Sequence, residues 1–277
     1  MLRVTLNSTA AFKMMIDVLD YANYPDLTFH AKPTGLECML RNSTHQVLCV
    51  CLIPARKCVK YEYPGGNDGL RSFTLCIAYM KRALRIFREE DRFSLEFDTR
   101  NPRSITIMST DFNNFERSRI EIILTQEIIH PALPLPKMEA DVVVSMKAER
   151  LVVILEDLMQ FGNDCAISYT KNELKFSTQG DQMILCCAVS LHQDTDDELV
   201  IQMTGEESAN VRSIVHTFPF GFLYPMSCIS FMALKNRIKF GLTEKGNLVM
   251  EMNAKDDEIT MMMFFFNEEE EKESLSE

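Results

Sequence analysis

One order of sequence patterns occurs twice in this chain. The first copy has an amphipathic segment at residues 12–19, followed by three strand-like segments that end near Leu52. The second copy has a similar amphipathic segment at residues 154–158, again followed by three strand-like segments, which end near Ala188. Each copy is typical of a short helix followed by three strands. The repetition predicts a duplicated domain, which strongly restricts the folds available to the chain.

Length and composition agree with two globular domains. The chain has 277 residues, enough for two domains that each bury a core. It is 46% hydrophobic with only ten glycines and ten prolines, so most of it is expected to be globular. No apolar run approaches the roughly 18 to 20 residues that span a bilayer, and the N-terminus lacks a signal-peptide pattern. We therefore expect a soluble protein that is not secreted by the usual route.

The nine cysteines are expected to be reduced thiols. Their number is odd, several lie within apolar strand patterns, and no two form a C-x-x-C pair. This usage is typical of buried thiols in an intracellular protein, and a zinc site or a disulfide is the alternative. The cysteines are Cys38, Cys49, Cys51, Cys58, Cys76, Cys165, Cys186, Cys187 and Cys228.

The first half of the sequence predicts a helix among several strands. Apolar residues from Phe12 to Leu19 recur at the helical spacing i, i+3, i+4, i+7, and Ser8 or Thr9 can cap this helix. A cluster of Pro, Gly, Asn and Asp at residues 64–69 is typical of a loop. Period-two alternation predicts the strands. These are residues 2–7, 26–31, 35–40, 46–53, 93–97, 104–107 and 120–123.

A second helix is predicted from about Leu75 to Arg88. Its apolar positions share one side at 100° per residue, and its basic positions share another. The basic side is the densest group of positive charge in a chain whose formal net charge is −11. A net-acidic protein does not coat nucleic acid with its whole surface, but a local basic stripe can still bind phosphate. The stripe consists of Lys81, Arg82, Arg85 and Arg88.

Prolines separate the two copies of the repeat. Three of them are interleaved with apolar residues between Thr125 and Asp141, and proline does not fit a central strand. We therefore predict an extended interdomain connector. After it, helices are predicted at about 148–161 and within 222–236, and the chain ends in an acidic tail. The predicted strands of this half are residues 142–145, 165–170, 173–178, 182–191, 198–203, 237–243, 247–253 and 258–266.

This ordered series resembles the DNA sliding clamp family that includes proliferating cell nuclear antigen. Residues 157–164 and 174–180 resemble the opening helix, turn and strands of the clamp's second domain, and residues 42–45 resemble the Asp-Ser-Ser-His turn of the clamp's first domain. The resemblance implies an α+β fold, a duplicated two-domain DNA clamp in which each domain has two β-sheets and two helices that line a central hole. It divides the chain into an N-terminal clamp domain at 1–124, a connector at 125–141, a C-terminal clamp domain at 142–266 and an acidic tail at 267–277.

The resemblance also implies that the helices of a closed ring face double-stranded DNA without reading its sequence. Four positions depart from the family, because Met14, Asp20, Val153 and Glu156 stand at places that are commonly basic. The ring is therefore expected to be unevenly charged, with either a weaker grip on DNA or differently charged subunits that complete it. The candidate DNA-binding residues are Lys13, Lys81, Arg82, Arg85, Arg88, Lys147, Arg150 and Lys235.

Two further surfaces are implied by the resemblance. Partner peptides dock beside the connector in a hydrophobic pocket, although apolar connector residues often pack only on their own domain. Subunits close the ring by pairing edge strands head to tail, for which residues 116–124 and 181–190 are the matching positions. The candidate pocket residues are Leu40, His45, Leu48, Ile128, Ile129, Phe264 and Phe266.

Three functional hypotheses follow. The first is a non-enzymatic clamp that encircles DNA, is placed there by a clamp loader, and tethers polymerase, ligase or nuclease peptides as a processivity factor in replication and repair. The second is one subunit of a heterotrimeric DNA-damage checkpoint clamp, instead of a homotrimer. The third, a thiol or metal enzyme, is disfavoured because the five histidines are scattered and no H-E-x-x-H, G-x-S-x-G or P-loop motif is present. We expect no catalytic residue, cofactor, metal or membrane partner, and a nuclear location, or a viral replication compartment if the protein is viral.

Overall fold

The computed structural model describes most of the chain and divides it into two compact units. The first unit consists of Met1–Leu40, Cys49–Leu135 and Asn253–Met261, and the second of Arg41–Leu48, Pro136–Met252 and Met262–Glu277. The predicted domain boundaries at the connector stay a prediction. The described residues are 1–21, 24–41, 47–63, 72–98, 103–124, 140–169, 173–180, 184–190, 199–203, 214–219, 237–243, 247–253 and 258–265.

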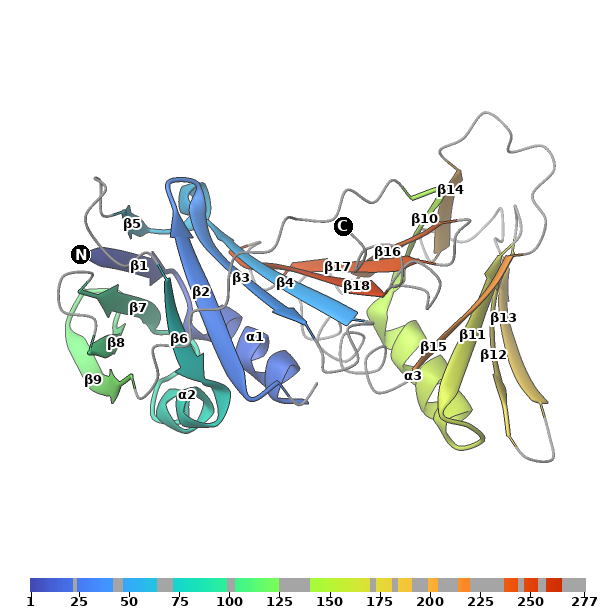
Figure 1. Ribbon diagram of the computed structural model, residues 1–277, viewed down its shortest axis with the longest axis horizontal. Helices are drawn as coiled ribbons and strands as arrows, with labels where there is room; N and C mark the ends of the chain where they lie inside the picture. The colour runs from blue at the N-terminus through green and yellow to red at the C-terminus, as the bar shows by residue number, and fades with distance from the viewer. Residues whose placement is uncertain are drawn as a thin grey trace, which may run out of the picture. The chain divides into compact units, whose positions relative to one another are not determined.

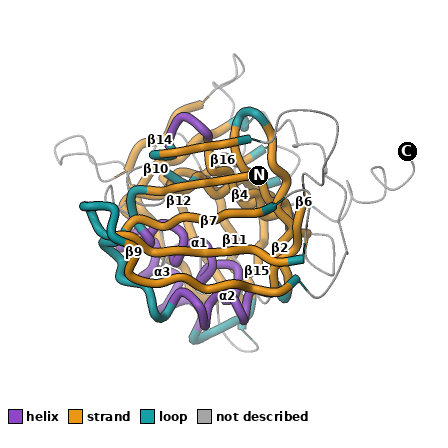
Figure 2. Tube along the Cα trace, turned by 90° about the vertical axis from the view of Figure 1, so that its left-hand side faces the viewer, coloured by secondary structure: helices purple, strands orange, loops and turns teal. Residues whose placement is uncertain are grey.

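A five-stranded antiparallel sheet belongs to the first unit, and its strands run side by side in Figure 2. The strand order is β5-β1-β7-β8-β9, so β5 and β9 are its edges. Leu2, Val4 and Leu6 on β1 are buried, as their alternation with polar residues predicts. The strands are β1 (Leu2–Leu6), β5 (Lys60–Glu62), β7 (Arg92–Phe97), β8 (Ser104–Thr110) and β9 (Glu116–Ile123).

Four further strands, which lie mostly in the first unit, have the order β4-β3-β2-β6; the last residue of β3 and the first two of β4 belong to the second unit. Gly35, where β3 begins, has a φ of 148°, and a Cβ at this position would lie 2.2 Å from the carbonyl oxygen of Ile53. Only glycine permits this backbone conformation and this close approach to the end of β4. The strands are β2 (Asp26–Lys32), β3 (Gly35–Arg41), β4 (Val47–Pro54) and β6 (Ser72–Cys76), and a short 3-10 helix, η1 (Ala55–Lys57), follows β4.

Helix α1 (Thr9–Tyr21) closes the core of the first unit. Its apolar positions, among them Phe12 and Leu19, are buried, which confirms the predicted amphipathic helix. The ring of Phe12 stacks on that of Phe93 in β7, with centroids 4.2 Å apart, and lies 6.3 Å from that of Phe29 in β2. Phe12 therefore fills the space between strands that are far apart in the sequence.

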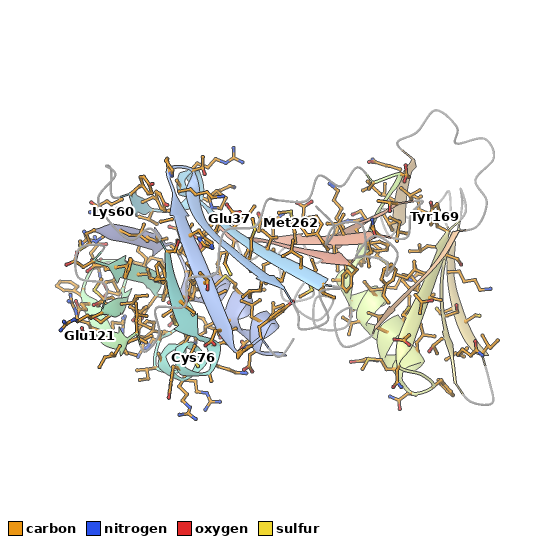
Figure 3. The ribbon with its side chains drawn as sticks, in the orientation of Figure 1. Glu37, Lys60, Cys76, Glu121, Tyr169 and Met262 are labelled. Atoms are coloured by element: carbon orange, nitrogen blue, oxygen red, sulfur yellow. The ribbon has the colours of Figure 1, made fainter. Side chains whose placement is uncertain are left out.

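Helix α2 (Ile77–Leu84) is shorter than the predicted helix at 75–88. Leu75 and Cys76 belong to β6, where they pair with residues of β2, and Figure 3 labels Cys76 at the junction. After Leu84 the chain turns with hydrogen bonds to the third preceding residue, from the Ile86 and Phe87 amides. The prediction was wrong at both ends because pairing with β2 holds the first residues in a strand, and the helix unwinds before Arg88. Helices α1 and α2 pack side by side (Figure 1).

The second unit repeats the organisation of the first. The order β1-α1-β2-β3-β4 returns as β10-α3-β11-β12-β13, which confirms the duplication. Its sheets have the orders β14-β10-β16-β17 and β13-β12-β11-β15. The elements are β10 (Val142–Lys147), α3 (Ala148–Met159), β11 (Asp164–Tyr169), β12 (Glu173–Gln179), β13 (Ile184–Ser190), β14 (Leu199–Met203), β15 (Ile214–Pro219), β16 (Arg237–Leu242) and β17 (Leu248–Asn253), while β18 (Thr260–Phe265) has residues in both units.

The predicted strands that fall on described residues are confirmed within a few residues at each end. Strands β5, β6 and β15 were not predicted; the last two residues of β6 were assigned to the following helix, and β15 ends in a proline. The predicted helix within 222–236, the connector at 125–139 and the tail at 267–277 lie outside the described residues. None of the described helices combines the length and apolar character that a membrane-spanning segment requires.

The described cysteines are free thiols, and three of them cluster in the first unit. Cys38, Cys49 and Cys51 are at most 1% exposed, and the sulfurs of Cys49 and Cys51 are 4.0 Å apart. Burial raises the pKa of the Cys38 thiol, and a hydrogen bond with Cys51 together with burial raises that of Cys49. Uncharged, buried thiols act as small apolar side chains, so these residues contribute packing.

Candidate nucleic-acid interface

The basic face of α2 consists of Lys81, Arg82, Arg85 and Arg88, the last two just beyond the end of the helix. All three arginines are exposed. Among the described residues, no carboxylate forms an ion pair with any of them. Their guanidinium groups are therefore available to phosphate, for which arginine offers several donors in a fixed geometry.

Lys81 differs from the three arginines because it faces α1. Its Nζ lies 2.5 Å from Oδ2 of Asp20 and 3.7 Å from Oδ1 of Asp17. The hydrogen bond to Asp20 raises the pKa of Lys81, so the ammonium group stays charged, but two carboxylates offset that charge. Asp20 therefore partly neutralises the positive charge of this part of the basic face.

Lys13 also joins the two helices. Its Nζ donates a hydrogen bond of 2.8 Å to the carbonyl oxygen of Phe87, at the end of the turn that follows α2. The side chain is half-buried. Lys13 therefore positions the basic segment, and its predicted contact with DNA stays a prediction.

The exposed face of α3 carries the opposite charge. Glu149, Glu156 and Asp157 are exposed and lie on one side of the helix together with Val153, which is 52% exposed. Arg150 is half-buried at the flank of this face, and the exposed Lys147 precedes the helix. Because Val153 and Glu156 face solvent, the exposed face of α3 is acidic where that of α2 is basic, and an unevenly charged ring stays a prediction. Lys235 lies outside the described residues.

The candidate partner-peptide pocket is described only in part. Leu40, Leu48 and Phe264 are between 3% and 7% exposed. They are therefore buried side chains, and the pocket stays a prediction. The remaining candidates, His45, Ile128, Ile129 and Phe266, lie outside the described residues.

Both strands predicted to close a ring lie at sheet edges. Strand β9, marked by Glu121 in Figure 3, is the last strand of the five-stranded sheet, and β13 is the last strand of the four-stranded sheet. Each exposes a large aliphatic side chain, Ile123 at 73% and Ile184 at 68%. Unpaired apolar edges of this kind invite pairing with another chain. The sequence reasoning missed two neighbours of β9, Phe112 and Phe115, because single aromatic residues in a turn carry no periodic pattern.

Comparison with known proteins agrees with this architecture. Residues 134–268 match the family model described as proliferating cell nuclear antigen, C-terminal domain. The chain is 22% identical over 253 residues to the proliferating cell nuclear antigen of Chaetomium thermophilum, covering 91% of this chain and 92% of that protein. The crystal structure of proliferating cellular nuclear antigen from Entamoeba histolytica has the same fold, with a TM-score of 0.76, 15% identity and coverage of 95% of this chain and 97% of that one.

Two units that repeat one order of strands and helices define an α+β fold of the duplicated clamp class, as predicted. The chain thus has the fold of proliferating cell nuclear antigen, and its residues 134–268 are similar to the C-terminal domain of that sliding clamp.

Proposed function

We propose that the chain is a DNA sliding clamp that encircles duplex DNA and acts as a processivity factor in replication and repair. The three exposed arginines of this basic face, Arg82, Arg85 and Arg88, form no ion pair with a described carboxylate, and in a chain with the clamp fold and a net charge of −11 they are the observation that carries this proposal. A net-acidic surface repels DNA, whereas the local arginines attract its backbone. Contacts to phosphate alone hold the duplex without fixing a sequence, which permits sliding.

The proposed DNA contacts are sparse and concentrated in the first unit. Arg82, Arg85 and Arg88 supply the main positive charge, and Lys81 adds a partly neutralised one. Lys13, Lys147, Arg150 and Lys235 are proposed as secondary contacts. A ring that holds DNA topologically needs only weak attraction at each subunit, because escape requires the ring to open or the DNA to end.

The proposed assembly is a ring of about three protomers, closed by pairing β9 of one with β13 of the next. A contact between two different edges of one chain is heterologous, and it forms a ring when the rotation closes. A clamp loader would open this ring on DNA. Polymerase, ligase or nuclease peptides are the proposed partners, docked in the pocket that includes Leu40, Leu48 and Phe264, and the chain itself acts as a scaffold without catalysis in the nucleus.

A heterotrimeric checkpoint clamp is the second candidate. It is favoured by the acidic face of α3, because helices of a ring built from this chain alone would present Glu149, Glu156 and Asp157 beside DNA. Sister subunits with more basic helices would restore an attractive inner surface. In that case the chain would form a ring only when two other clamp-like chains are supplied.

Retention on circular DNA tests the proposed function. The protein is loaded onto a nicked circular plasmid by a clamp loader with ATP, and bound protein is separated from free protein by gel filtration at moderate salt. A sliding clamp co-elutes with the circle and is lost when the plasmid is linearised. Equal retention on circular and linear DNA, or no retention on either with or without sister chains, would contradict the proposal.

Substituting Asp20→Asn is expected to raise the affinity for short duplex DNA by about twofold. A unit negative charge about 10 Å from a phosphate costs about 0.4 kcal/mol in water, and removing it leaves Lys81 with Asp17 as its remaining carboxylate partner. Fluorescence anisotropy at low salt measures the change. Asp98→Asn, which neutralises an exposed carboxylate that follows β7, serves as the matched control. An unchanged or lower affinity in Asp20→Asn would show that this part of α1 does not face DNA.

A further inference from the structure

Two large apolar side chains lie exposed beside the arginines of α2. Tyr79 is 57% exposed in the helix, and Ile86 is 65% exposed in the turn that follows it. Isolated exposed apolar residues are common on protein surfaces. These two, however, adjoin the face that we propose to meet DNA, and contacts to phosphate do not account for them. Tyr79 and Ile86 are called the apolar row below.

The apolar row and the arginines lie on separate sides of the exposed face. Arg85, the C-terminal capping residue of α2, has φ and ψ angles of −62° and −26°, so the helical spacing continues to Ile86. Lys81 lies on the side of α1, to which it is joined by its ion pairs with Asp17 and Asp20. At 100° per residue, the exposed face therefore changes from charged to apolar with distance from α1. From that side outward the order is Lys81, Arg85, Arg82, Ile86 and Tyr79.

A ligand that fits this face has phosphate on one side and apolar surface on the other. A single strand of nucleic acid has this form, because its backbone is charged and the faces of its unpaired bases are free to stack. Proteins that bind such strands without sequence preference combine basic side chains with aromatic side chains on which the bases stack. A duplex hides its base faces within its own stack and offers little to an exposed tyrosine.

Helix α1 borders the same face with negative charge. Asp17 is exposed and Asp20 is half-buried, and α1 packs against α2. Packed helices have axes about 8 to 10 Å apart, and the two backbones of a duplex are separated by grooves about 6 and 12 Å wide. When one backbone of a duplex lies on the arginines of α2, the other meets either the carboxylates of α1 or the apolar row, and neither binds phosphate. A single strand has only one backbone and avoids both.

The apolar row is held in place before any ligand binds. Leu84 is buried in the core, and the Ile86 amide donates a hydrogen bond to the Ala83 carbonyl at 3.3 Å. Directly after Ile86, the Phe87 carbonyl accepts the 2.8 Å hydrogen bond from Nζ of Lys13. Little backbone entropy is therefore lost when a ligand covers this surface, so that a small number of contacts can discriminate between ligands.

We propose that Tyr79 is a specificity-determining residue that stacks on an unpaired base, so that the face of α2 binds single-stranded DNA more tightly than duplex DNA. The inference rests on the proposed function, because it names the form of DNA that the same face prefers. Arg82 and Arg85 contact the phosphates of the strand, and its bases are directed away from α1 toward Ile86 and Tyr79. A clamp with this preference rests where a duplex gives way to a single strand, as at a gap.

The test compares two variants of Tyr79 on a labelled single strand of about 12 nucleotides, a usual site size, and on the duplex of equal length. Fluorescence anisotropy of the full chain at low salt is expected to show tighter binding of the single strand by the wild type. Tyr79→Leu keeps an apolar, helix-forming side chain without the ring. It should weaken single-strand binding about 5- to 20-fold, within the range for one stacked base, and duplex binding by less than about twofold. Tyr79→Phe keeps the ring and should retain the wild-type affinity.

An abasic strand of the same length gives a result that only stacking produces. Without bases, the wild type and Tyr79→Leu should bind with equal affinity, because the backbone contacts are the same in both. Phe161→Leu is the matched control, since Phe161 is 39% exposed after α3, and the loss of its ring should leave both affinities unchanged. Circular dichroism establishes that every variant is folded.

Failure of this inference and failure of the proposed function give different results. If the protein is retained on circular DNA, and Tyr79→Leu changes the two affinities equally or not at all, the stacking contact is overturned while the clamp function stands. A loss of single-strand affinity in Tyr79→Phe, or tighter binding of RNA of the same sequence, also overturns the inference. If single-strand binding depends on the ring of Tyr79 but nothing is retained on circular DNA, the inference stands and the clamp function is overturned.

Discussion

Replacing Arg82 and Arg85 with glutamate is expected to lower the affinity for duplex DNA on the order of 100-fold at low salt. Each substitution removes a phosphate contact and adds a negative charge to a helix whose arginines have no partner among the described carboxylates. In a ring the change occurs once in every subunit, so its effect is multiplied. The slope of log affinity against log salt should become shallower by about 2 per protomer engaged with DNA. Fluorescence anisotropy with a short duplex at several salt concentrations measures both quantities.

The matched control places the same charge change elsewhere in the first unit. Arg56 and Lys57 are exposed on η1, away from both long helices of that unit, and Arg56→Glu with Lys57→Glu alters the net charge equally. This control should change the affinity by no more than a few-fold, through the long-range field alone. Equal losses in the two double variants would mean that α2 carries no special contact. Sedimentation under the same conditions separates a loss of DNA binding from a loss of assembly.

Phe93→Ala is expected to lower the free energy of unfolding of the first unit by about 3 to 5 kcal/mol, the range for a buried phenylalanine truncated to alanine. Phe93 is fully buried in β7, stacks on Phe12 at 4.2 Å, and lies 6.4 Å from Phe87, the residue to which Lys13 bonds. The substitution therefore leaves a cavity at the place where α1, β7 and the end of α2 meet. Urea denaturation at fixed protein concentration measures the change, because assembly stabilises the folded chain by mass action.

Phe112→Ala is the control, because it makes the same chemical change at an exposed position. It removes the same ring from a site that is 69% exposed, and surface changes of this kind stay within about 0.5 kcal/mol under conditions where the chain is monomeric. A loss below about 1 kcal/mol for Phe93→Ala would indicate that the aromatic cluster relaxes to fill the cavity. A similar loss for both variants would show that the exposed ring is not free in the monomer.

Much of the fold could be predicted because alternation and helical periodicity are local. The buried positions of β1 and α1 follow directly from the spacing of Leu2, Val4 and Leu6 and of the apolar residues after Thr9. The start of α2 could not be predicted, since Leu75 and Cys76 are apolar in a way that suits either a helix or a strand. They form a strand because they pair with β2, whose residues are far away in the sequence.

The candidate site, too, could be predicted from the sequence only in part. Spacing alone placed Arg82 and Arg85 on one face of α2, and the structure leaves both exposed. It could not show that Lys13 donates to the Phe87 carbonyl or that Lys81 pairs with Asp20, because each contact joins residues more than 60 positions apart. The turn that contains Asn114 likewise depends on a residue of another strand, because Arg92 of β7 donates a hydrogen bond to Asn114. The composition of this turn therefore does not indicate that its backbone is held in place.

No loop residue separates β6 from α2. Cys76 is the last residue of the strand, Ile77 is the first of the helix, and the Ile77 amide donates to the Pro25 carbonyl at 2.9 Å. The register of β6 on β2 therefore determines the direction in which the arginines of α2 point. Over evolution, insertions and deletions ahead of β6 can accumulate without rotating the helix, whereas a single-residue slip of β6 would turn its charged face by a full 100°.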